Sequence, residues 1–544
     1  MSGELPLKAH CLPFRQIPHT SRLFIDFLEW APPVRRFYPR SAKFSEWFRD
    51  ETSNVHYEPA RRARVAGILE RQNKGWGASV TTLQNIARLR SGALAAVTGQ
   101  QVGLFGGPVF SLYKALSAVK LAEEAGKAGI DCVPVFWLAT QDHDLEEVNQ
   151  VTIPGADGQL NKILAPSEGV ADSPVGNVNL GAEVEAAVNA AAELLGESEA
   201  IASLRESYRA GETFGSAFAR LFATLFGEWG VILLDASDPD LNAVAAPVYA
   251  AAIERAEELD EKLLARGKEL EAAGYHQQVK VTSSSTLVFS LKDGARVAVH
   301  RGSSSGFLIG DEKISREELL SRVNAHPQDF SANVLLRPVV QDYLLPTLAY
   351  TGGAAETAYF AQAGVVYEAL AGRVTPVVPR FSATVLESKS QGLLVKYDLQ
   401  FTDILRGPEF IRQHLAAHSL PQELQAAFDD AESKLEKSLV KIRDLIGKLD
   451  KTLVEAATNA SSKMGHQLES LRSRAARAEL RQSEVLTRHA EALSNLLYPE
   501  KALQERQVAS IYFMGRYGAQ FLRDLHQTIH VDCPDHQVVT IDLN

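Results

Sequence analysis

The chain contains little cysteine, and its few cysteines are scattered. Three of its 544 residues are cysteines, namely Cys11, Cys132 and Cys533. Because a disulfide framework or a CxxC zinc site needs several cysteines at short spacing, the sequence excludes both. We therefore expect free thiols and a cytoplasmic protein. Cys132 lies in the middle of an apolar run, which indicates a core residue and not a nucleophile.

Excess positive charge and long apolar runs are missing as well. Lys and Arg number 56 against 67 Asp and Glu, which gives a net charge of −11. An acidic balance argues against a protein that coats nucleic acid. The first residues, MSGELPLKAH, lack the basic start and apolar core of a signal peptide. No run approaches the roughly 18 apolar residues of a membrane-spanning helix, so we expect no membrane partner.

What the sequence does contain is the pattern of a parallel α/β core. An apolar run at 93–97 precedes a glycine-rich stretch and a helix-like segment, and a second apolar run follows at 129–140. Strand, loop, helix and strand in this order are typical of a βαβ unit. Further buried strands are indicated near 230–236 and 369–381. The predicted fold class is therefore α/β, with a Rossmann-type parallel-sheet core.

The chain is too long for one simple core, so we expect additional segments. Turn residues punctuate 151–180, which predicts short strands and turns, and alternation around Asp293 and Gly294 predicts a β-hairpin. The predicted organisation is an N-terminal helical segment (1–90), the first half of the core (91–150), core strand with connecting insertions and the hairpin (151–330), the second half of the core (331–385), a helical coiled-coil domain (386–500) and a C-terminal segment that returns to the core (501–544).

Apolar residues recur at heptad spacing between residues 421 and 497. A pattern sustained over several heptads predicts a coiled coil. Such a seam commonly joins two subunits, so our first interpretation is a homodimer, and an antiparallel hairpin within one chain is the equally weighted alternative. The seam residues are Leu424, Phe428, Ala431, Leu435, Leu439, Ile442, Ile446, Leu449 and Leu453, followed by Met464, Leu468, Leu471, Ala475, Ala478 and Val485.

The glycine-rich stretch TGQQVGLFGGP (98–108) is the first candidate for ligand binding. Its spacing matches neither GxGxxG nor the Walker pattern, so a tight strand-to-helix turn is the alternative interpretation. However, a helix N-terminus attracts anions, and ligands of open α/β sheets bind beyond the strands' carboxyl ends. The candidate nucleotide- and phosphate-binding residues are Thr98, Gly99, Gln100, Gln101, Gly103, Gly106, Gly107 and, two turns into the helix, Lys114.

A dense polar cluster, TQDHDLEE (140–147), directly follows the second apolar strand. Asp142, His143 and Asp144 are our catalytic candidates, because two acids around a histidine can bind a divalent metal or orient an amine and an attacking group. The alternative is the acidic first turn of a helix. We expect the cluster to lie beside the glycine-rich stretch, since adjacent parallel strands place both at one edge.

Polar residues are also threaded through an apolar segment, residues 331–362. Arg337 is suited to carboxylate or phosphate recognition, and a structural ion pair is the alternative. Together with Glu147 of the preceding cluster, the predicted substrate-binding residues are Asn333, Arg337, Gln341, Glu356 and Tyr359.

Taken together, these motifs resemble the cysteine-adding enzymes of bacillithiol biosynthesis, the BshC family. TGQQVGLFGGP, FWLATQDHDLEEVN, NVLLRPVVQDYLLPTLAYTGG, TPVVPRFSATVLE and YPEKALQERQVASIYFMGRYG stand in the family's order between residues 98 and 518. The resemblance implies a Rossmann-type core akin to class I synthetases and nucleotidyltransferases, with connecting insertions and a dimerising coiled coil. Two positions depart from the family pattern: Val102 replaces a proline, and Gln141 replaces an acid.

The resemblance further implies a ligase that joins L-cysteine to glucosaminyl-malate through an amide, the last step in making this low-molecular-weight thiol. Amide formation from a free carboxylate is uphill, so we expect ATP with Mg²⁺ and neither a redox cofactor nor zinc. The catalytic cluster would bind the cysteine ammonium or Mg²⁺, or deprotonate the glucosamine amine, while Arg337 would hold the malyl carboxylates. The rival class is a non-catalytic, nucleotide-binding scaffold or regulator of the pathway.

Overall fold

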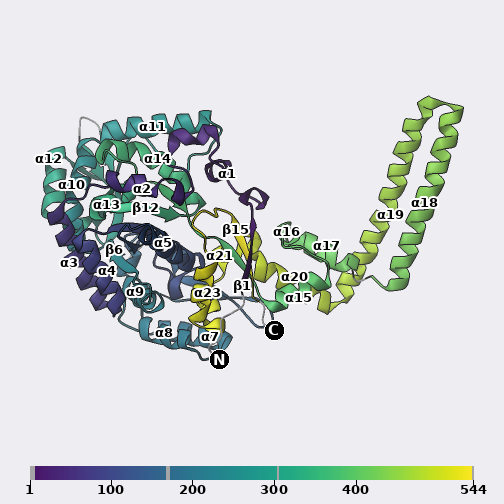
Figure 1. Cartoon of the computed structure of the whole chain (residues 1–544), viewed down its shortest axis with the longest axis horizontal. Coiled ribbons are helices and arrows are strands. Elements are labelled where there is room, and N and C mark those ends of the chain that lie inside the picture. The colour runs from purple at the N-terminus through teal and green to yellow at the C-terminus, as the bar shows by residue number, and fades with distance from the viewer. Residues whose placement is uncertain (1–6, 167–171, 303–305, 419, 542–544) are drawn as a thin grey trace. The chain divides into compact units, whose positions relative to one another are not determined.

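The computed structural model describes residues 7–166, 172–302, 306–418 and 420–541 (Figure 1). The predicted segments 1–90, 151–330, 386–500 and 501–544 each include a few residues outside this description. The chain divides into two compact units. One contains residues up to 153, 161–385 and 505–544, and the other contains 154–160 and 386–504.

A five-stranded parallel sheet forms the centre of the first unit. Its order is β13 (Val377–Pro379), β12 (Thr347–Gly352), β2 (Leu94–Gln100), β3 (Cys132–Leu138) and β6 (Ile232–Asp235), and all neighbouring strands run parallel. The chain builds outward from β2 to β3 and β6, and then returns to place β12 on the other side of β2. The predicted α/β fold class with a Rossmann-type core is therefore confirmed, although β12 was not among the predicted strands.

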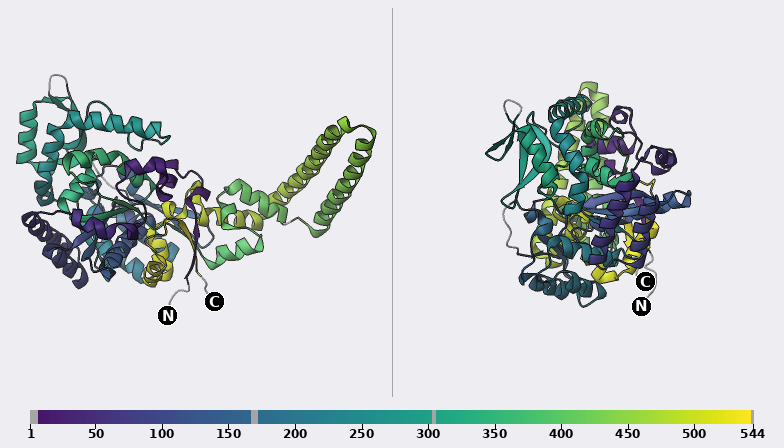
Figure 2. Two further views of the ribbon diagram at one scale, coloured as in Figure 1. Left: turned by 45° about the horizontal axis from the view of Figure 1, so that its top comes forward. Right: turned by 90° about the vertical axis from the view of Figure 1, so that its left-hand side faces the viewer.

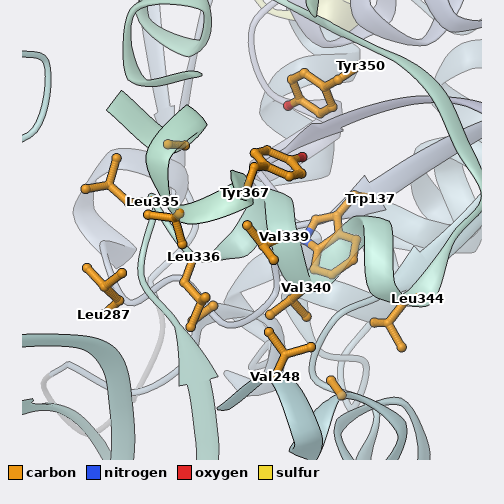
Figure 3. Packing of buried hydrophobic residues seen from close by; sticks show 14 of the residues in the cluster. Trp137, Val248, Leu287, Leu335, Leu336, Val339, Val340, Leu344, Tyr350 and Tyr367 are labelled. Carbon is orange, nitrogen blue, oxygen red and sulfur yellow. The ribbon is translucent and has the colours of Figure 1, made fainter. Parts of the chain in front are cut away.

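The central strands are mostly buried because they are covered on both faces. Every residue of β3 is buried. Helix α5 (Phe110–Lys127) connects β2 to β3 and packs on both, and α14 (Ala354–Leu370) connects β12 to β13. Figure 3 shows α13 (Arg337–Leu344) placing apolar side chains in the core beside Trp137 of β3 and Tyr350 of β12.

An antiparallel sheet of the order β10-β9-β8-β7-β11 belongs to the same unit. Strands β7 (Ser285–Lys292) and β8 (Ala295–Arg301) form the predicted hairpin, and both turn residues, Asp293 and Gly294, have positive φ. Glycine and aspartate suit such a turn because positive φ costs them little. The other three strands are β9 (Phe307–Ile309), β10 (Glu312–Ile314) and β11 (Phe330–Ala332).

A third sheet adds a strand to the N-terminal segment, whose other regular elements before residue 90 are helices. It contains β1 (Leu7–Leu12), β15 (His536–Ile541) and β14 (Ala383–Leu386), with β1 antiparallel to β15. The partner of β1 is more than 500 residues away in the sequence, so no local pattern announced the pairing. Helices α3 (Pro59–Gly75) and α4 (Val80–Ser91) follow later in this segment.

The second unit is helical, as the heptad pattern indicated. Helices α18 (Gln422–Leu449) and α19 (Val454–Gln482) pack side by side as an antiparallel hairpin within one chain, joined by a short turn (Figure 2). The hairpin alternative is therefore present, yet it leaves a row of exposed apolar residues that includes Ile442, Leu445 and Leu449. The remaining helices include α15 (Ser388–Lys396), α17 (Pro408–His418) and α20 (Glu484–Leu497). Among the described helices, none has the length and apolar character needed to cross a membrane.

Candidate active site

A pocket of about 340 Å³ lies at the carboxyl ends of the central strands. Gly99 and Gln100 end β2, Gly353 follows β12, and Trp137 comes from the end of β3. Strands β2 and β12 are neighbours from which the chain proceeds in opposite directions, and such a switch point is where open α/β sheets bind ligands. A volume of a few hundred Å³ suits a small metabolite.

The pocket gathers about half of the predicted site residues. Its lining includes Gly99, Gln100, Gln101, Lys114, Asp142, Asn333, Arg337, Glu356 and Tyr359. The lining does not include Thr98, Gly103, Gly106, Gly107, His143, Asp144, Glu147 or Gln341. The two groups therefore have to be considered separately.

Lys114 and Glu356, which both line the pocket, form an ion pair. The Nζ of Lys114 lies 2.8 Å from Oε2 of Glu356 and donates to the backbone oxygen of Gly99 and to Oε1 of Gln100, both at 2.8 Å. Burial lowers the pKa of Lys114 to about 8, although the charge of Glu356 opposes this shift. Lys114 is thus a cation that can lose its proton near neutral pH.

Glu356 stays ionised in this surrounding. It lies in the first turn of α14, where its Oε2 accepts a hydrogen bond from the backbone N–H of Gly353 at 2.7 Å. The hydroxyl of Tyr350 donates to Oε1. Burial alone would raise the pKa of Glu356, but Lys114 and these hydrogen bonds lower it below its usual value.

Arg337, the first residue of α13, lines the pocket and forms no ion pair with a carboxylate among the residues that the structure describes. Its Nη2 donates to the hydroxyl of Tyr359 at 2.7 Å and its Nη1 to Oε1 of Gln341 at 3.2 Å. The guanidinium also lies over the rings of Trp137 and Tyr350, at 5.9 and 5.4 Å. Because the side chains that hold it are neutral, Arg337 is oriented but its charge remains available to an anionic ligand. Gln341, outside the lining, acts by orienting Arg337.

Arg380 lines the pocket but was not predicted as a site residue. Its Nη2 and Nη1 donate to Oε1 and Oε2 of Glu505 at 2.6 and 3.1 Å. Glu505 also accepts hydrogen bonds from the Ser382 hydroxyl and the Ala383 N–H. Both members of this pair are buried, and Nη1 of Arg380 also donates to the Phe381 oxygen at 2.7 Å, so several hydrogen bonds hold the two charges.

A buried histidine supports the same network. Nδ1 of His536 lies 2.7 Å from the Ser382 hydroxyl, and its Nε2 lies 3.0 Å from the Thr384 hydroxyl. Burial lowers the pKa of His536 to about 4, against the pull of Glu505, so the ring is neutral at neutral pH. Strand β15 thus helps to fix the loop that carries Arg380.

Two further arginines line the pocket and were also missed. Arg506 makes no hydrogen bond or ion pair with the residues that the structure describes, and burial lowers its pKa. Arg296 of β8 is held by the Ser331 hydroxyl and the Ala332 oxygen, at 3.0 and 2.7 Å, and stacks on Phe289. With Lys114, Arg337 and Arg380 they give the pocket five cationic side chains, of which Lys114 and Arg380 are ion-paired with Glu356 and Glu505.

Asp142 joins the polar cluster to the glycine-rich stretch, as the strand order predicted. Its Oδ2 accepts from Nε2 of Gln101 at 2.8 Å, and the same amide nitrogen lies 3.0 Å from Oε2 of Glu147. This contact crosses from the end of β2 to the end of β3. Asp142 therefore reaches the pocket, while Glu147 lies at its margin.

The other two predicted catalytic residues, His143 and Asp144, do not line the pocket and contact other partners. Asp144 is exposed and accepts a hydrogen bond from the N–H of Glu147 at 3.2 Å, which caps the short helix α6 (Leu145–Val148). The alternative interpretation, that the cluster forms the acidic first turn of a helix, therefore applies to Asp144. Nδ1 of His143 lies 3.2 Å from Nη1 of Arg296. Because arginine can only donate, His143 accepts at Nδ1 and carries its proton at Nε2.

The turn at Gly103, Gly106 and Gly107 packs inside the protein. Gly106 and Gly107 have φ of 87° and 69°, which glycine adopts without strain. The N–H of Gly107 donates to the Leu104 oxygen at 2.8 Å, and the start of α5 is covered where the Val109 N–H donates to Val508 at 2.8 Å. The tight-turn alternative describes these glycines, and only the Gly99–Gln101 part of the stretch faces the pocket.

Two family models together match nearly the whole chain. Residues 7–381 match the model of the N-terminal Rossmann-like domain of bacillithiol biosynthesis BshC, and residues 383–541 match the model of its C-terminal coiled-coil domain. Two proteins named "Putative cysteine ligase BshC", from Koribacter versatilis and Solibacter usitatus, are 48% and 35% identical to the chain. The matches cover 98% of the chain in each case, and 99% and 100% of the relatives. A protein of the same name from Geobacillus thermodenitrificans is 29% identical over 96% of the chain and 99% of its own length. The chain therefore belongs to the BshC family of bacillithiol biosynthesis.

Proposed function

We propose that this chain is an ATP-dependent ligase that joins L-cysteine to glucosaminyl-malate through an amide. The name of its relatives supports a cysteine ligase. The observation that carries the finer proposal is the composition of the pocket, whose lining combines arginines and a lysine with the carboxylates of Asp142 and Glu356 at the switch point. Cysteine, a malyl group and ATP together present several anionic groups and ammonium groups, and this pocket complements both charges.

The proposed reaction has two steps. The cysteine carboxylate attacks a phosphorus atom of ATP, which forms an acyl adenylate with loss of pyrophosphate or an acyl phosphate with loss of ADP. The glucosamine amine then attacks the activated carbonyl carbon, forming the C–N bond. AMP or phosphate leaves, and the amine gives up one proton.

The side chains divide these tasks by charge. Arg337 and Arg506, which have no carboxylate partner among the described residues, bind the malyl carboxylates or the phosphates. Lys114 adds a buried positive charge next to Gln100. Asp142 binds an ammonium group or takes the proton of the attacking amine.

Magnesium would enter with the nucleotide. Among the described residues no three His, Cys, Asp or Glu side chains are grouped as a ready metal site. Asp142 and Glu147 nevertheless share Nε2 of Gln101 and could offer one or two carboxylate oxygens. Mg²⁺ is commonly held by one or two carboxylates together with phosphates and water. The donor set therefore fits an ion that is completed by ATP.

We further propose that the protein is a homodimer formed through the helical hairpin. Ile442, Leu445 and Leu449 are spaced by three and four residues on α18, so they share one face, and all three are exposed in the single chain. A stripe of this kind is typical of a surface covered by another helix.

One assay distinguishes the proposed ligase from the rival function, a non-catalytic nucleotide-binding scaffold. The purified protein is incubated with L-cysteine, glucosaminyl-malate, ATP and Mg²⁺, and thiol product and nucleotide are quantified. A ligase forms one amide for each ATP cleaved, and omission of any substrate stops product formation. Nucleotide binding without product would favour the scaffold.

A further inference from the structure

Two thiols meet at the edge of the three-stranded sheet. Sγ of Cys11, on β1, lies 2.9 Å from Sγ of Cys533, on the loop before β15. Cys11 is exposed and Cys533 is half-buried, whereas Cys132 is buried in the central sheet. The pair is therefore in contact, open to solvent, and composed of residues outside the pocket lining.

The backbone on both sides holds this contact in place. Cys11 is paired with Gln537 in the β1–β15 ladder, and the Cys533 N–H donates to the His530 oxygen at 3.1 Å. The neighbouring Asp532 anchors the loop by accepting a hydrogen bond from the Ser45 N–H at 3.1 Å. A disulfide has an S–S length of about 2.05 Å, so bond formation requires the two sulfurs to approach by less than roughly 1 Å.

We propose that Cys11 and Cys533 form a reversible intramolecular disulfide, with a low-molecular-weight disulfide RSSR as the oxidant. One cysteine thiolate attacks RSSR, which forms a mixed disulfide and releases RS⁻. The second thiolate attacks the protein sulfur of that mixed disulfide, which forms the Cys11–Cys533 bond and releases the second RS⁻. The two protein thiols lose two electrons and two protons, and RSSR becomes two RSH.

The Cys11–Cys533 disulfide would fasten β1, a strand that few other contacts hold. β1 is the edge strand of its sheet and is largely exposed, so few side-chain contacts hold it. A cross-link that joins β1 to the distant loop closes a very long chain segment and restricts the unfolded state. Burial and the neighbouring Cys533 raise the pKa of the Cys11 thiol to about 12, so exchange at neutral pH is slow and incubation lasts hours.

The experiment equilibrates the full-length protein with buffers of varied ratio of oxidised to reduced glutathione, which are a disulfide RSSR and its thiol RSH. Samples are quenched with acid, alkylated with N-ethylmaleimide, digested and analysed by mass spectrometry. We expect one cross-linked peptide pair containing Cys11 and Cys533 in oxidising buffer, and its loss in excess reduced glutathione. The oxidised protein is expected to unfold at a temperature at least about 3 °C higher than the reduced protein.

Two variants provide matched controls. Cys132→Ser should keep both the cross-link and the temperature shift, and Cys11→Ser should lose both. Free thiols at both positions in every buffer would overturn the proposal, as would cross-links that join two chains. A cross-link that withstands excess reductant in the folded protein would contradict reversibility. A cross-link that leaves the unfolding temperature unchanged would contradict the stabilisation of β1.

Discussion

Arg380 and Glu505 form a buried, two-bond ion pair, with nitrogen–oxygen distances of 2.6 and 3.1 Å between residues 125 positions apart. The pair joins the pocket to the segment that closes the first unit. Removing one member of a buried pair leaves a charge without compensation, which costs about 3–5 kcal/mol. Glu505→Gln should therefore lower the free energy of unfolding by this amount, measured by denaturant unfolding.

A double variant separates stability from function at this pair. Arg380→Met combined with Glu505→Gln removes both charges, so it should regain much of the lost stability. It should still bind the anionic substrate poorly, because the pocket has lost a cation. A Glu505→Gln protein as stable as the wild type would contradict the assigned role of the pair.

Asp142 and Asp144 should differ sharply although they are two residues apart. Asp142→Asn should lower kcat at least about a hundredfold, since Asp142 reaches the pocket and proton transfer or ammonium binding depends on its charge. Asp144→Ala removes a helix cap, which typically costs about 1 kcal/mol, and should leave kcat within roughly twofold. Steady-state kinetics of both variants decides, and the opposite order of effects would refute this assignment.

Lys114 should make ATP binding sensitive to alkaline pH. The pKa of Lys114 is about 8, below its usual value, so Nζ is protonated below that pH and loses its positive charge as the pH rises through it. ATP affinity should therefore be highest below pH 8 and fall above it, as measured by calorimetric titration. The Lys114→Met variant should bind ATP weakly, and its ATP affinity should stay constant between pH 7 and about 9. If the ATP affinity of this variant still falls at alkaline pH, another group causes the fall.

Arg506 offers a test of ligand binding without a structural side effect. It has no hydrogen-bond or ion-pair partner in the part of the chain that the structure describes. Arg506→Gln should raise KM for an anionic substrate about tenfold, which corresponds to about 1.4 kcal/mol, while the melting temperature stays the same. If the melting temperature falls and KM does not change, Arg506 has a structural role instead.

The dimer prediction concerns the exposed stripe of α18. Leu445→Glu with Leu449→Glu should convert the dimer to a monomer in light scattering, because two charges would be placed in an apolar contact. Lys448→Glu, an exposed polar position on the same helix, is the control and should leave the dimer intact. A wild-type protein that is monomeric at micromolar concentration would refute the proposal.

In the central parallel sheet, the sequence predicted the strands that contain continuous apolar runs and missed β12. β3 was recognisable because parallel strands covered on both faces are continuous apolar runs. β12, with the sequence TLAYTG, carries two threonines and a tyrosine and so lacks that signature. β1 was missed because its partner β15 lies at the far end of the chain.

The candidate site was only half predictable for a related reason. Asp142 was predicted because polar residues that directly follow a parallel strand lie at the edge of the sheet where ligands bind. The same reasoning, applied to the residue after β13 (Val377–Pro379), would have predicted Arg380. Nothing local marked Arg296 or Arg506, since a hairpin and a late segment carry them to the pocket through long-range packing. Conversely, Gly103, Gly106 and Gly107 were predicted to bind phosphate because of the glycine-rich composition. The start of α5 is instead covered by Val508, a contact between distant parts of the chain that no local pattern could predict.

The most direct test of the account is product formation by wild-type protein and by Arg337→Met under identical conditions. Each protein is given L-cysteine, glucosaminyl-malate, ATP and Mg²⁺, and the amide product is quantified by mass spectrometry. We expect one amide for each ATP consumed by the wild type, and at least about a hundredfold less product from Arg337→Met at low substrate concentration. Absence of product from the wild type, or equal product from a folded Arg337→Met protein, would contradict it.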